Sequence, residues 1–209
     1  MENKRNVLPG LIIALATLIY LPVKAQDQKP AFYQLDIKKS KLLWTAPKNK
    51  HNGFILFNEG KLNNISAGWP TSGTFNINMN SMHSTSEDTP AGRKKVDDKL
   101  RADDFFAVAK YPTATMLVKR IVPEPNGSTF KIYGDLKIKD VTKPIEFTAI
   151  MKQNGNALTA TASTNISRSN WSISHPPASA AWNILDRLKD NLIANDIPIT
   201  LNLVFNKKQ

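Results

Sequence analysis

Three histidines are the side chains best suited to acid-base chemistry or metal binding, and they lie far apart in the sequence. His51, His83 and His175 form no pair at a spacing shared by common metal-ligand motifs. His83 with Glu87 and Asp88 comes nearest to a metal cluster, in a segment rich in serine and threonine. Because the chain has no cysteine, thiol catalysis and cysteine-bound metals are excluded. We expect no metal site, and we interpret His51 as a hydrogen-bonding residue at a hairpin.

Nucleophilic catalysis would need a serine beside a general base that an acid orients. The chain contains no Gly-x-Ser-x-Gly motif. Its acidic residues mostly flank turns, where carboxylates cap backbone groups and stay solvated. A pair of carboxylates for glycoside hydrolysis remains open, since a sequence does not show which acids meet. We predict that the protein is not an enzyme and has no catalytic residue and no cofactor; a lipid-ester hydrolase is kept as an alternative.

The amino-terminal segment has the features of a cleaved export signal. Lys4 and Arg5 precede an apolar run over 7–23, and Val23 and Ala25 stand three and one positions before a cut after Ala25. An uncleaved anchor is the alternative, because the run approaches the roughly 20 apolar residues of a spanning helix. We predict a signal peptide over 1–25 and one domain over 26–209, located in the periplasm or secreted.

The chain is basic, with a formal net charge of +11 that stays positive after removal of residues 1–25. Its lysines are spread along the chain and do not cluster with aromatic residues, as they do in nucleic-acid-binding proteins. We therefore expect no nucleic-acid partner. A solubilising surface that can be drawn to anionic lipid headgroups explains the charge better.

The dominant pattern after residue 26 is an alternation of apolar and polar residues, which is typical of strands with one apolar face. Eight segments show it: 42–46, 55–57, 75–80, 116–118, 130–139, 145–151, 158–164 and 197–205. Many strands with short connections and little helix predict an all-β fold, either a sandwich or an eight-stranded antiparallel barrel.

Turn signals and two short helices complete the expected elements. Two segments have helical spacing, 92–101 and 180–190, and we expect the first to cover an opening of the sheet. The turn signals between strands are Asn52-Gly53, Glu59-Gly60, Pro125-Asn126-Gly127 and Asn154-Gly155.

The segment Lys-Leu-Arg-Ala-Asp-Asp-Phe-Phe-Ala-Val-Ala-Lys-Tyr-Pro at 99–112 resembles the signature of the YceI-like family. Three further segments, at 50–53, 134–144 and 168–171, follow in the order of that family. The resemblance covers nearly all of 26–209. It implies an exported lipocalin-like barrel that binds polyisoprenoids, with an isoprenoid or quinone-type lipid as the ligand.

The chain also departs from the family at three positions. Ala102 stands where a small hydroxyl residue is usual, Lys99 where histidine is frequent, and Ser172 where glycine is expected. None of the three removes an apolar barrel position. The identity of the ligand is therefore less transferable than the fold.

A pocket for a long apolar tail needs inward hydrocarbon side chains and few buried charges. On the alternation alone, a barrel filled by its own side chains is favoured, and only the resemblance favours a cavity. The methionines suit an irregular ligand because their side chains adapt. The predicted pocket residues are Trp44, Phe57, Phe75, Ile77, Met79, Phe105, Phe106, Met116, Val118, Phe147 and Met151.

Four residues are candidates for the mouth of such a pocket. Phe105 and Phe106 follow the first expected helix and could form a lid over a tail or a plug that seals one end. Arg101 and Arg168 are candidates for contact with a headgroup. For Arg101, pairing with carboxylates such as Asp103 or Asp104 is the favoured alternative.

An apolar stripe is expected on the outside of one strand. If Ile55 and Phe57 point inward, Phe54 and Leu56 point outward, which predicts a dimer contact or a membrane-facing patch. The function that combines these features is carriage, buffering or sequestration of a polyisoprenoid or similar lipid. A filled barrel that serves as a stress-related or adhesive scaffold is the alternative.

Overall fold

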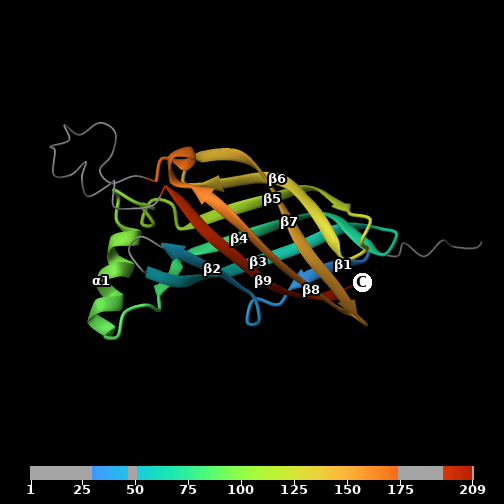
Figure 1. Ribbon diagram of the computed structural model, residues 1–209, viewed down its shortest axis with the longest axis horizontal. Coiled ribbons are helices and arrows are strands. Elements are labelled where there is room, and N and C mark those ends of the chain that lie inside the picture. Colours follow the sequence, from blue (N-terminus) through green and yellow to red (C-terminus); the bar gives the residue numbers. More distant parts are fainter. Residues whose placement is uncertain (1–29, 47–50, 174–194, 209) are drawn as a thin grey trace, which may run out of the picture.

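A computed structural model describes residues 30–46, 51–173 and 195–208, which form a barrel of antiparallel strands (Figure 1). The helices are α1 (Pro90–Arg101) and the short 3-10 helix η2 (Arg168–Trp171). The strands are β1 (Phe32–Leu35), β2 (Lys41–Ala46), β3 (His51–Ser66), β4 (Trp69–Ser84), β5 (Thr113–Pro123), β6 (Thr129–Ile138), β7 (Val141–Asn154), β8 (Ala157–Ser167) and β9 (Asp196–Lys208).

The nine strands occupy eight positions around a closed barrel. From β3 to β9, each strand pairs with the next one along the chain, and the short strands close the ring between β9 and β3. Both β1 and β2 pair with β3 on one side and with β9 on the other, so together they fill a single position. The predicted eight-stranded antiparallel barrel is therefore confirmed. The alternation pattern missed β1, which has only four residues.

The first barrel position is split because residues 36–40 leave the strand as a turn. The Asp36 carboxylate accepts hydrogen bonds from the backbone N–H groups of Lys38 (3.2 Å) and Lys39 (3.3 Å). The Ser40 hydroxyl oxygen accepts a hydrogen bond from the Val204 N–H at 3.0 Å, which replaces a backbone pairing with β9. The turn is therefore held firmly at both of its ends.

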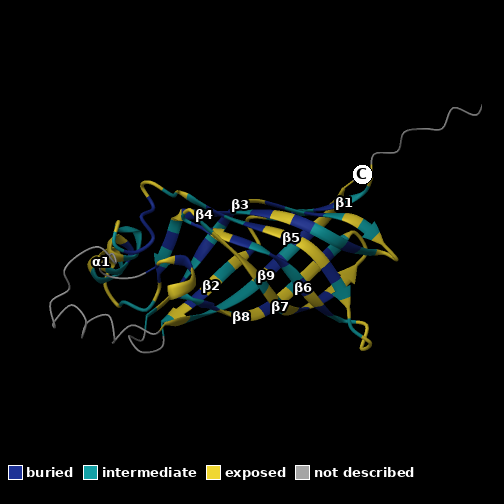
Figure 2. Cartoon of the chain, turned by 90° about the horizontal axis from the view of Figure 1, so that it is seen from above, coloured by how far each residue is buried: buried dark blue, intermediate teal, exposed yellow. Residues whose placement is uncertain are grey.

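Burial follows the period of two that the sequence indicates. Along β4, the side chains of Phe75, Ile77 and Met79 are buried, whereas the asparagines between them are more exposed. Figure 2 shows the same alternation of buried and exposed residues along the barrel strands. The apolar faces thus converge on the interior, as expected for a sheet closed on itself.

Two of the predicted turn signals lie inside a strand instead. Gly53 and Gly60 belong to the 16-residue strand β3. A Cβ atom on Gly53 would lie 2.0 Å from the His83 carbonyl oxygen and 2.6 Å from the Trp44 ring, so only glycine fits there. By contrast, Gly127 and Gly155 do lie in turns and have positive φ angles of 75° and 57°.

Helix α1 lies across one end of the barrel, as expected for the segment 92–101 (Figure 1). The Thr89 hydroxyl caps it by accepting a hydrogen bond from the Gly92 N–H at 3.0 Å. The expected helix over 180–190 lies outside the described residues. No helix in the described part of the chain is long and apolar enough to cross a membrane.

Candidate functional site

The interior of the barrel contains a cavity of about 200 Å³. Its lining residues extend from Leu62 and Phe205, near the β3–β4 hairpin end, to Leu100 and Phe105 at the α1 end. A single buried water needs only roughly 10–15 Å³ of such space. The apolar faces therefore do not fill the barrel, and a long apolar space remains between them.

The cavity lies closer to one side of the barrel than to the other. We call the side made by β3–β6 the packed wall, because all of its cavity-lining side chains are buried. We call the side made by β2 and β7–β9 the hollow wall, because many of its inward side chains remain only half-buried. These half-buried side chains are Leu42, Ala46, Ile145, Phe147, Ala160, Thr164, Ile197, Ile199 and Leu201.

Short side chains on β8 create much of this space. Its inward positions run from Leu158 through Ala160, Ala162 and Thr164 to Ile166, so three small residues stand in succession. Their neighbours across the β8–β9 pairing are Leu203, Leu201 and Ile199. A row of small side chains leaves room where larger ones on the opposite wall would otherwise meet them.

The end of the barrel away from α1 is solidly packed. Phe130 and Leu158 are completely buried, and neither lines the cavity. The Trp69 and Phe130 rings lie 4.6 Å apart between their centroids. Burial raises the pKa of the Tyr33 phenol, whose oxygen accepts a hydrogen bond from Gln153 Nε2 at 3.1 Å. This end therefore seals the barrel.

At the other end, the segment after α1 forms part of the cavity wall. Phe105 and Phe106 are buried, line the cavity and pack edge to face with centroids 5.3 Å apart. Lys139 Nζ donates hydrogen bonds to the backbone carbonyls of Phe105 (3.2 Å) and Ser172 (2.9 Å). Lys139 thus ties both segments to the β6–β7 turn. Whether the two phenylalanines act as a lid or as a plug stays a prediction.

Three of the described cavity-lining residues carry a hydroxyl or a charged group, and they lie toward the α1 end: Thr164, Arg168 and Asp196. Arg168 is only 5% exposed, and its Nη1 donates a hydrogen bond to the Ile173 carbonyl at 3.0 Å. Its guanidinium carbon lies 5.9 Å from the centroid of the Phe105 ring. The surface of the cavity is thus almost entirely apolar, and the three residues that carry these groups lie near one end.

Arg101, in contrast, does not line the cavity. Its Nη2 donates a hydrogen bond to the Met82 carbonyl, which joins the end of α1 to β4. The carboxylate of Asp104, one of the partners expected for Arg101, pairs with Lys99 Nζ at 2.6 Å. The structure therefore places Arg101 in a contact between α1 and β4, and its contact with a headgroup stays a prediction.

The histidines of the described chain form two contacts that join α1 and its preceding loop to the barrel. His83 Nδ1 lies 2.9 Å from Asp97 Oδ2, and Asp97 Oδ1 accepts a hydrogen bond from the Ser84 N–H at 2.6 Å. His51 Nδ1 lies 2.8 Å from Glu87 Oε1. His83 and Glu87 therefore have different partners in these two contacts. No group of three potential metal ligands occurs within the described ranges.

One serine lies near a histidine, but not in the arrangement of a hydrolytic relay. Ser86 Oγ lies 3.5 Å from His51 Nδ1, the same ring nitrogen that faces Glu87. In a serine hydrolase, the acid and the nucleophile contact opposite nitrogens of the imidazole. The contacts of His51 instead position the loop before α1.

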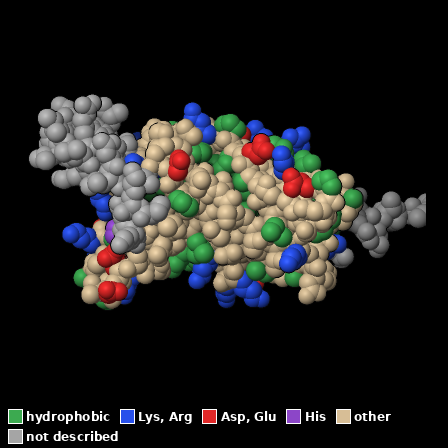
Figure 3. Space-filling model, viewed as in Figure 1, with side chains coloured by type: hydrophobic (Ala, Val, Ile, Leu, Met, Phe, Trp, Pro, Cys, Tyr) green, Lys and Arg blue, Asp and Glu red, His purple; other side chains and the backbone are tan. Residues whose placement is uncertain are grey.

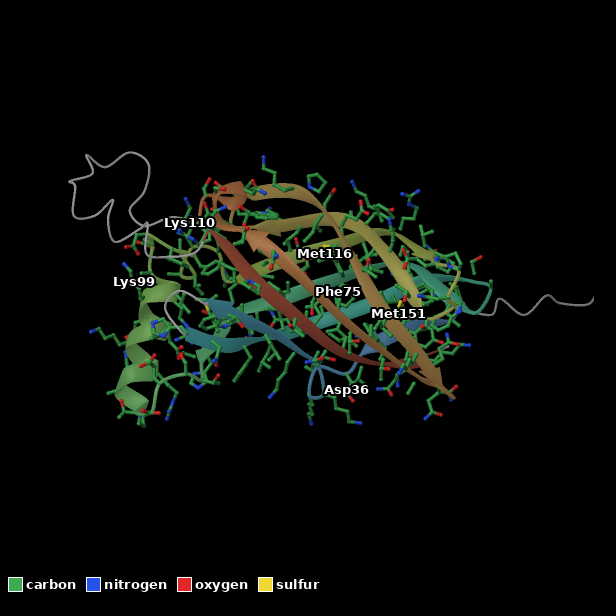
Figure 4. All side chains as sticks on the ribbon, in the orientation of Figure 1. Asp36, Phe75, Lys99, Lys110, Met116 and Met151 are labelled. Atoms are coloured by element: carbon green, nitrogen blue, oxygen red, sulfur yellow. The ribbon has the colours of Figure 1, made fainter. Side chains whose placement is uncertain are left out.

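All eleven residues predicted to line a pocket do line the cavity. Figure 4 shows three of them, Phe75, Met116 and Met151, within the barrel. Whether they contact a ligand stays a prediction. The prediction omitted most of the hollow wall, including Ala160, Ala162 and Thr164. The signal for these residues was present, since small residues at inward positions of a strand indicate space.

The outward stripe on β3 has the expected orientation but is less exposed than expected. Ile55 and Phe57 face the cavity, whereas Phe54 and Leu56 face outward and are half-buried. The Phe54 ring lies under Lys41 Nζ at 5.0 Å and beside the His83 ring at 5.4 Å. The apolar exposure in this region lies instead on the neighbouring turn and on β2.

Solved structures with the same fold are known. The crystal structure of BcnA from Burkholderia cenocepacia matches with a TM-score of 0.62 and 21% identity, over 81% of this chain and 98% of that one. A YceI protein of Campylobacter jejuni matches with a TM-score of 0.51 and 20% identity, over 76% of this chain and 82% of that one. At these identities, the likeness concerns the fold.

Two curated relatives are similar in sequence. A UPF0312 protein of Shewanella denitrificans is 26% identical over 149 residues, which is 70% of this chain and 72% of the relative. A UPF0312 protein of Vibrio parahaemolyticus is 30% identical over 156 residues, which is 70% of this chain and 73% of the relative. The family model for the YceI-like domain matches residues 33–205, which include nearly the whole barrel. The chain therefore belongs to the YceI-like family.

Proposed function

We propose that the protein binds a polyisoprenoid or another long-chain amphipathic lipid in the cell envelope and carries or sequesters it without catalysing a reaction. The observation that carries this proposal is the apolar cavity along the hollow wall. An apolar chain placed there would lose contact with water and gain roughly 25 cal/mol for each Å² of buried apolar surface. The export signal expected over 1–25 supports the location.

The distribution of polar groups supports a ligand with one polar end. The cavity is apolar from the sealed end onward, and Thr164, Arg168 and Asp196 line it near α1. A lipid would place its tail toward the sealed end, where no polar group has to be desolvated. Its polar group would then lie near the α1 end, within reach of donors and acceptors.

The contacts of the histidines favour binding over catalysis. His51 and His83 hold acidic side chains beside α1 and the loop before it. Neither histidine is among the described residues that line the cavity. Binding requires no covalent step. It requires an apolar space of suitable size, which the cavity provides.

Mass spectrometry of an organic extract from natively purified protein tests the proposal. We expect a lipid with an isoprenoid or similar tail at close to one molecule per protein. Protein that is clean after native purification and that takes up no added isoprenoid would contradict the proposal and favour a scaffold. Turnover of a lipid ester that is lost on replacement of His51 or Ser86 would favour the hydrolase.

A cavity-filling variant makes this test specific. Ala160 faces the cavity and is half-buried, so Ala160→Phe would occupy the space of the tail. Thr161→Phe is the matched control, because Thr161 is adjacent on β8 and exposed. We expect bound lipid to fall at least tenfold in Ala160→Phe and to stay unchanged in Thr161→Phe. Equal lipid in both variants, with both folded by circular dichroism, would place the ligand outside this cavity.

A further inference from the structure

The turn that splits the first barrel position projects an apolar and basic surface. We define the turn patch as Ile37, Lys38, Lys39, Lys41 and Leu43. Four large hydrophobic side chains are exposed in the described part of the chain, and two of them are in this patch: Ile37 is 43% exposed and Leu43 is 36% exposed. The turn patch thus combines one exposed apolar side chain on the turn and one on the outer face of β2 with three lysines.

The charge of the turn patch is positive. Its three lysines are exposed, and the side chain of Lys39 is 69% exposed. The acid within the turn, Asp36, is partly engaged, since it accepts two backbone hydrogen bonds and lies 3.6 Å from Lys39 Nζ. Figure 4 places Asp36 at the lower edge of the barrel, and Figure 3 shows Lys and Arg side chains along that edge.

The turn is anchored to the barrel by hydrogen bonds, and it lies beside a strand that lines the cavity. Ser40 is completely buried and hydrogen-bonds the Val204 backbone, so the projecting residues stand on a fixed base. The inner side of the same strand contributes Leu42 and Trp44 to the cavity. The turn patch therefore lies on the outside of the hollow wall, on the turn before β2 and on the face of β2 opposite the cavity.

We propose that the turn patch docks the protein on the surface of an anionic lipid bilayer. Lysines near such a surface are attracted to its negative potential, and the attraction decays over the Debye length of roughly 10 Å. Ile37 at the tip would enter the boundary between headgroups and acyl chains, as apolar residues of peripheral proteins do. Docking does not require a filled cavity, so it stands apart from the proposed lipid binding.

Vesicle sedimentation tests this docking. The probes are vesicles of phosphatidylcholine alone and of phosphatidylcholine mixed equally with phosphatidylglycerol. We expect binding only to the anionic vesicles, and weaker binding at high salt. Lys38→Gln combined with Lys39→Gln should lower the partition coefficient by about tenfold, and Ile37→Ser should lower it by about threefold.

Matched controls separate the turn patch from the overall charge. Lys137→Gln combined with Lys143→Gln removes two exposed lysines beside the β6–β7 turn, and Leu117→Ser removes a 47% exposed side chain from β5. All variants share one amino terminus, checked by mass spectrometry, and each is tested for folding and extractable lipid. Equal losses in patch and control variants, or no vesicle binding by the unaltered protein, would overturn the docking. The docking would also be overturned if the unaltered protein bound no vesicles but self-associated in sedimentation velocity, and if Ile37→Ser abolished that self-association.

Discussion

The packed wall and the hollow wall are built from the same pattern of alternating residues, yet their inward side chains are buried to different extents. On the packed wall, every cavity-lining side chain is buried by its neighbours. On the hollow wall, Leu201, Ile199 and Phe147 point inward with part of their surface uncovered. The comparison teaches that the size of the inward side chains, more than the alternation itself, decides whether a barrel is filled or hollow.

The difference also indicates where the stability of the protein is concentrated. The sealed end and the packed wall hold most of the completely buried side chains, such as Phe130 and Met82. Since no cysteine is available for a disulfide, hydrophobic burial carries this stability. The hollow wall contributes less and is available for a ligand.

Two leucines offer the strongest test of this comparison. Leu158 is completely buried at the sealed end, whereas Leu201 is half-buried on the hollow wall. We expect Leu158→Ala to lower the free energy of unfolding by about 3 kcal/mol or more. Leu201→Ala should cost about 1 kcal/mol, because its side chain already faces a cavity. Urea unfolding of delipidated protein measures both, and equal costs would erase the distinction between the two regions.

Adding atoms should give the same asymmetry, with a smaller effect. A methyl group on Gly53 would collide with the His83 carbonyl and the Trp44 ring, so Gly53→Ala should cost about 2 kcal/mol. Ala160→Leu adds three carbons on the hollow wall and should cost less than about 1 kcal/mol, since it fills space. Thermal unfolding monitored by tryptophan fluorescence compares the two variants. A larger loss in Ala160→Leu would mean that the space near Ala160 is already occupied.

The smallest effect concerns the segments at the α1 end. Lys139→Met keeps the aliphatic stem but removes the hydrogen bonds to Phe105 and Ser172. We expect a loss of about 1 kcal/mol in the free energy of unfolding. Amide hydrogen exchange should accelerate over 102–110 and remain unchanged at the sealed end. Uniform acceleration throughout the barrel would show that Lys139 supports the whole fold.

Much of the fold could be predicted from the sequence, because alternation in a strand directly reflects which face is buried. The pattern identified every strand except β1, whose four residues are too few to show a period. The sequence predicts turns at Gly53 and Gly60, which lie in β3, because glycine marks turns and close approaches alike. Only the pairing of β3 with its neighbours reveals that large side chains pack over these glycines.

The cavity was less predictable than its lining residues. Phe75 and Met116 would point inward in a filled barrel as well as in a hollow one. The space depends on the small side chains of β8 and on the larger ones that fail to reach them, which requires the order of strands around the barrel. Arg101 illustrates the same limit, because its partner, the Met82 carbonyl, is a backbone group that no side-chain pattern marks.

The methionines give the cavity a chemical vulnerability. All four methionines in the described chain, Met79, Met82, Met116 and Met151, line the cavity. Oxidation of a thioether to a sulfoxide converts an apolar, flexible side chain into a polar one. Peroxide would thus introduce oxygen atoms into an otherwise apolar cavity, and methionine sulfoxide reductases would be needed to restore it.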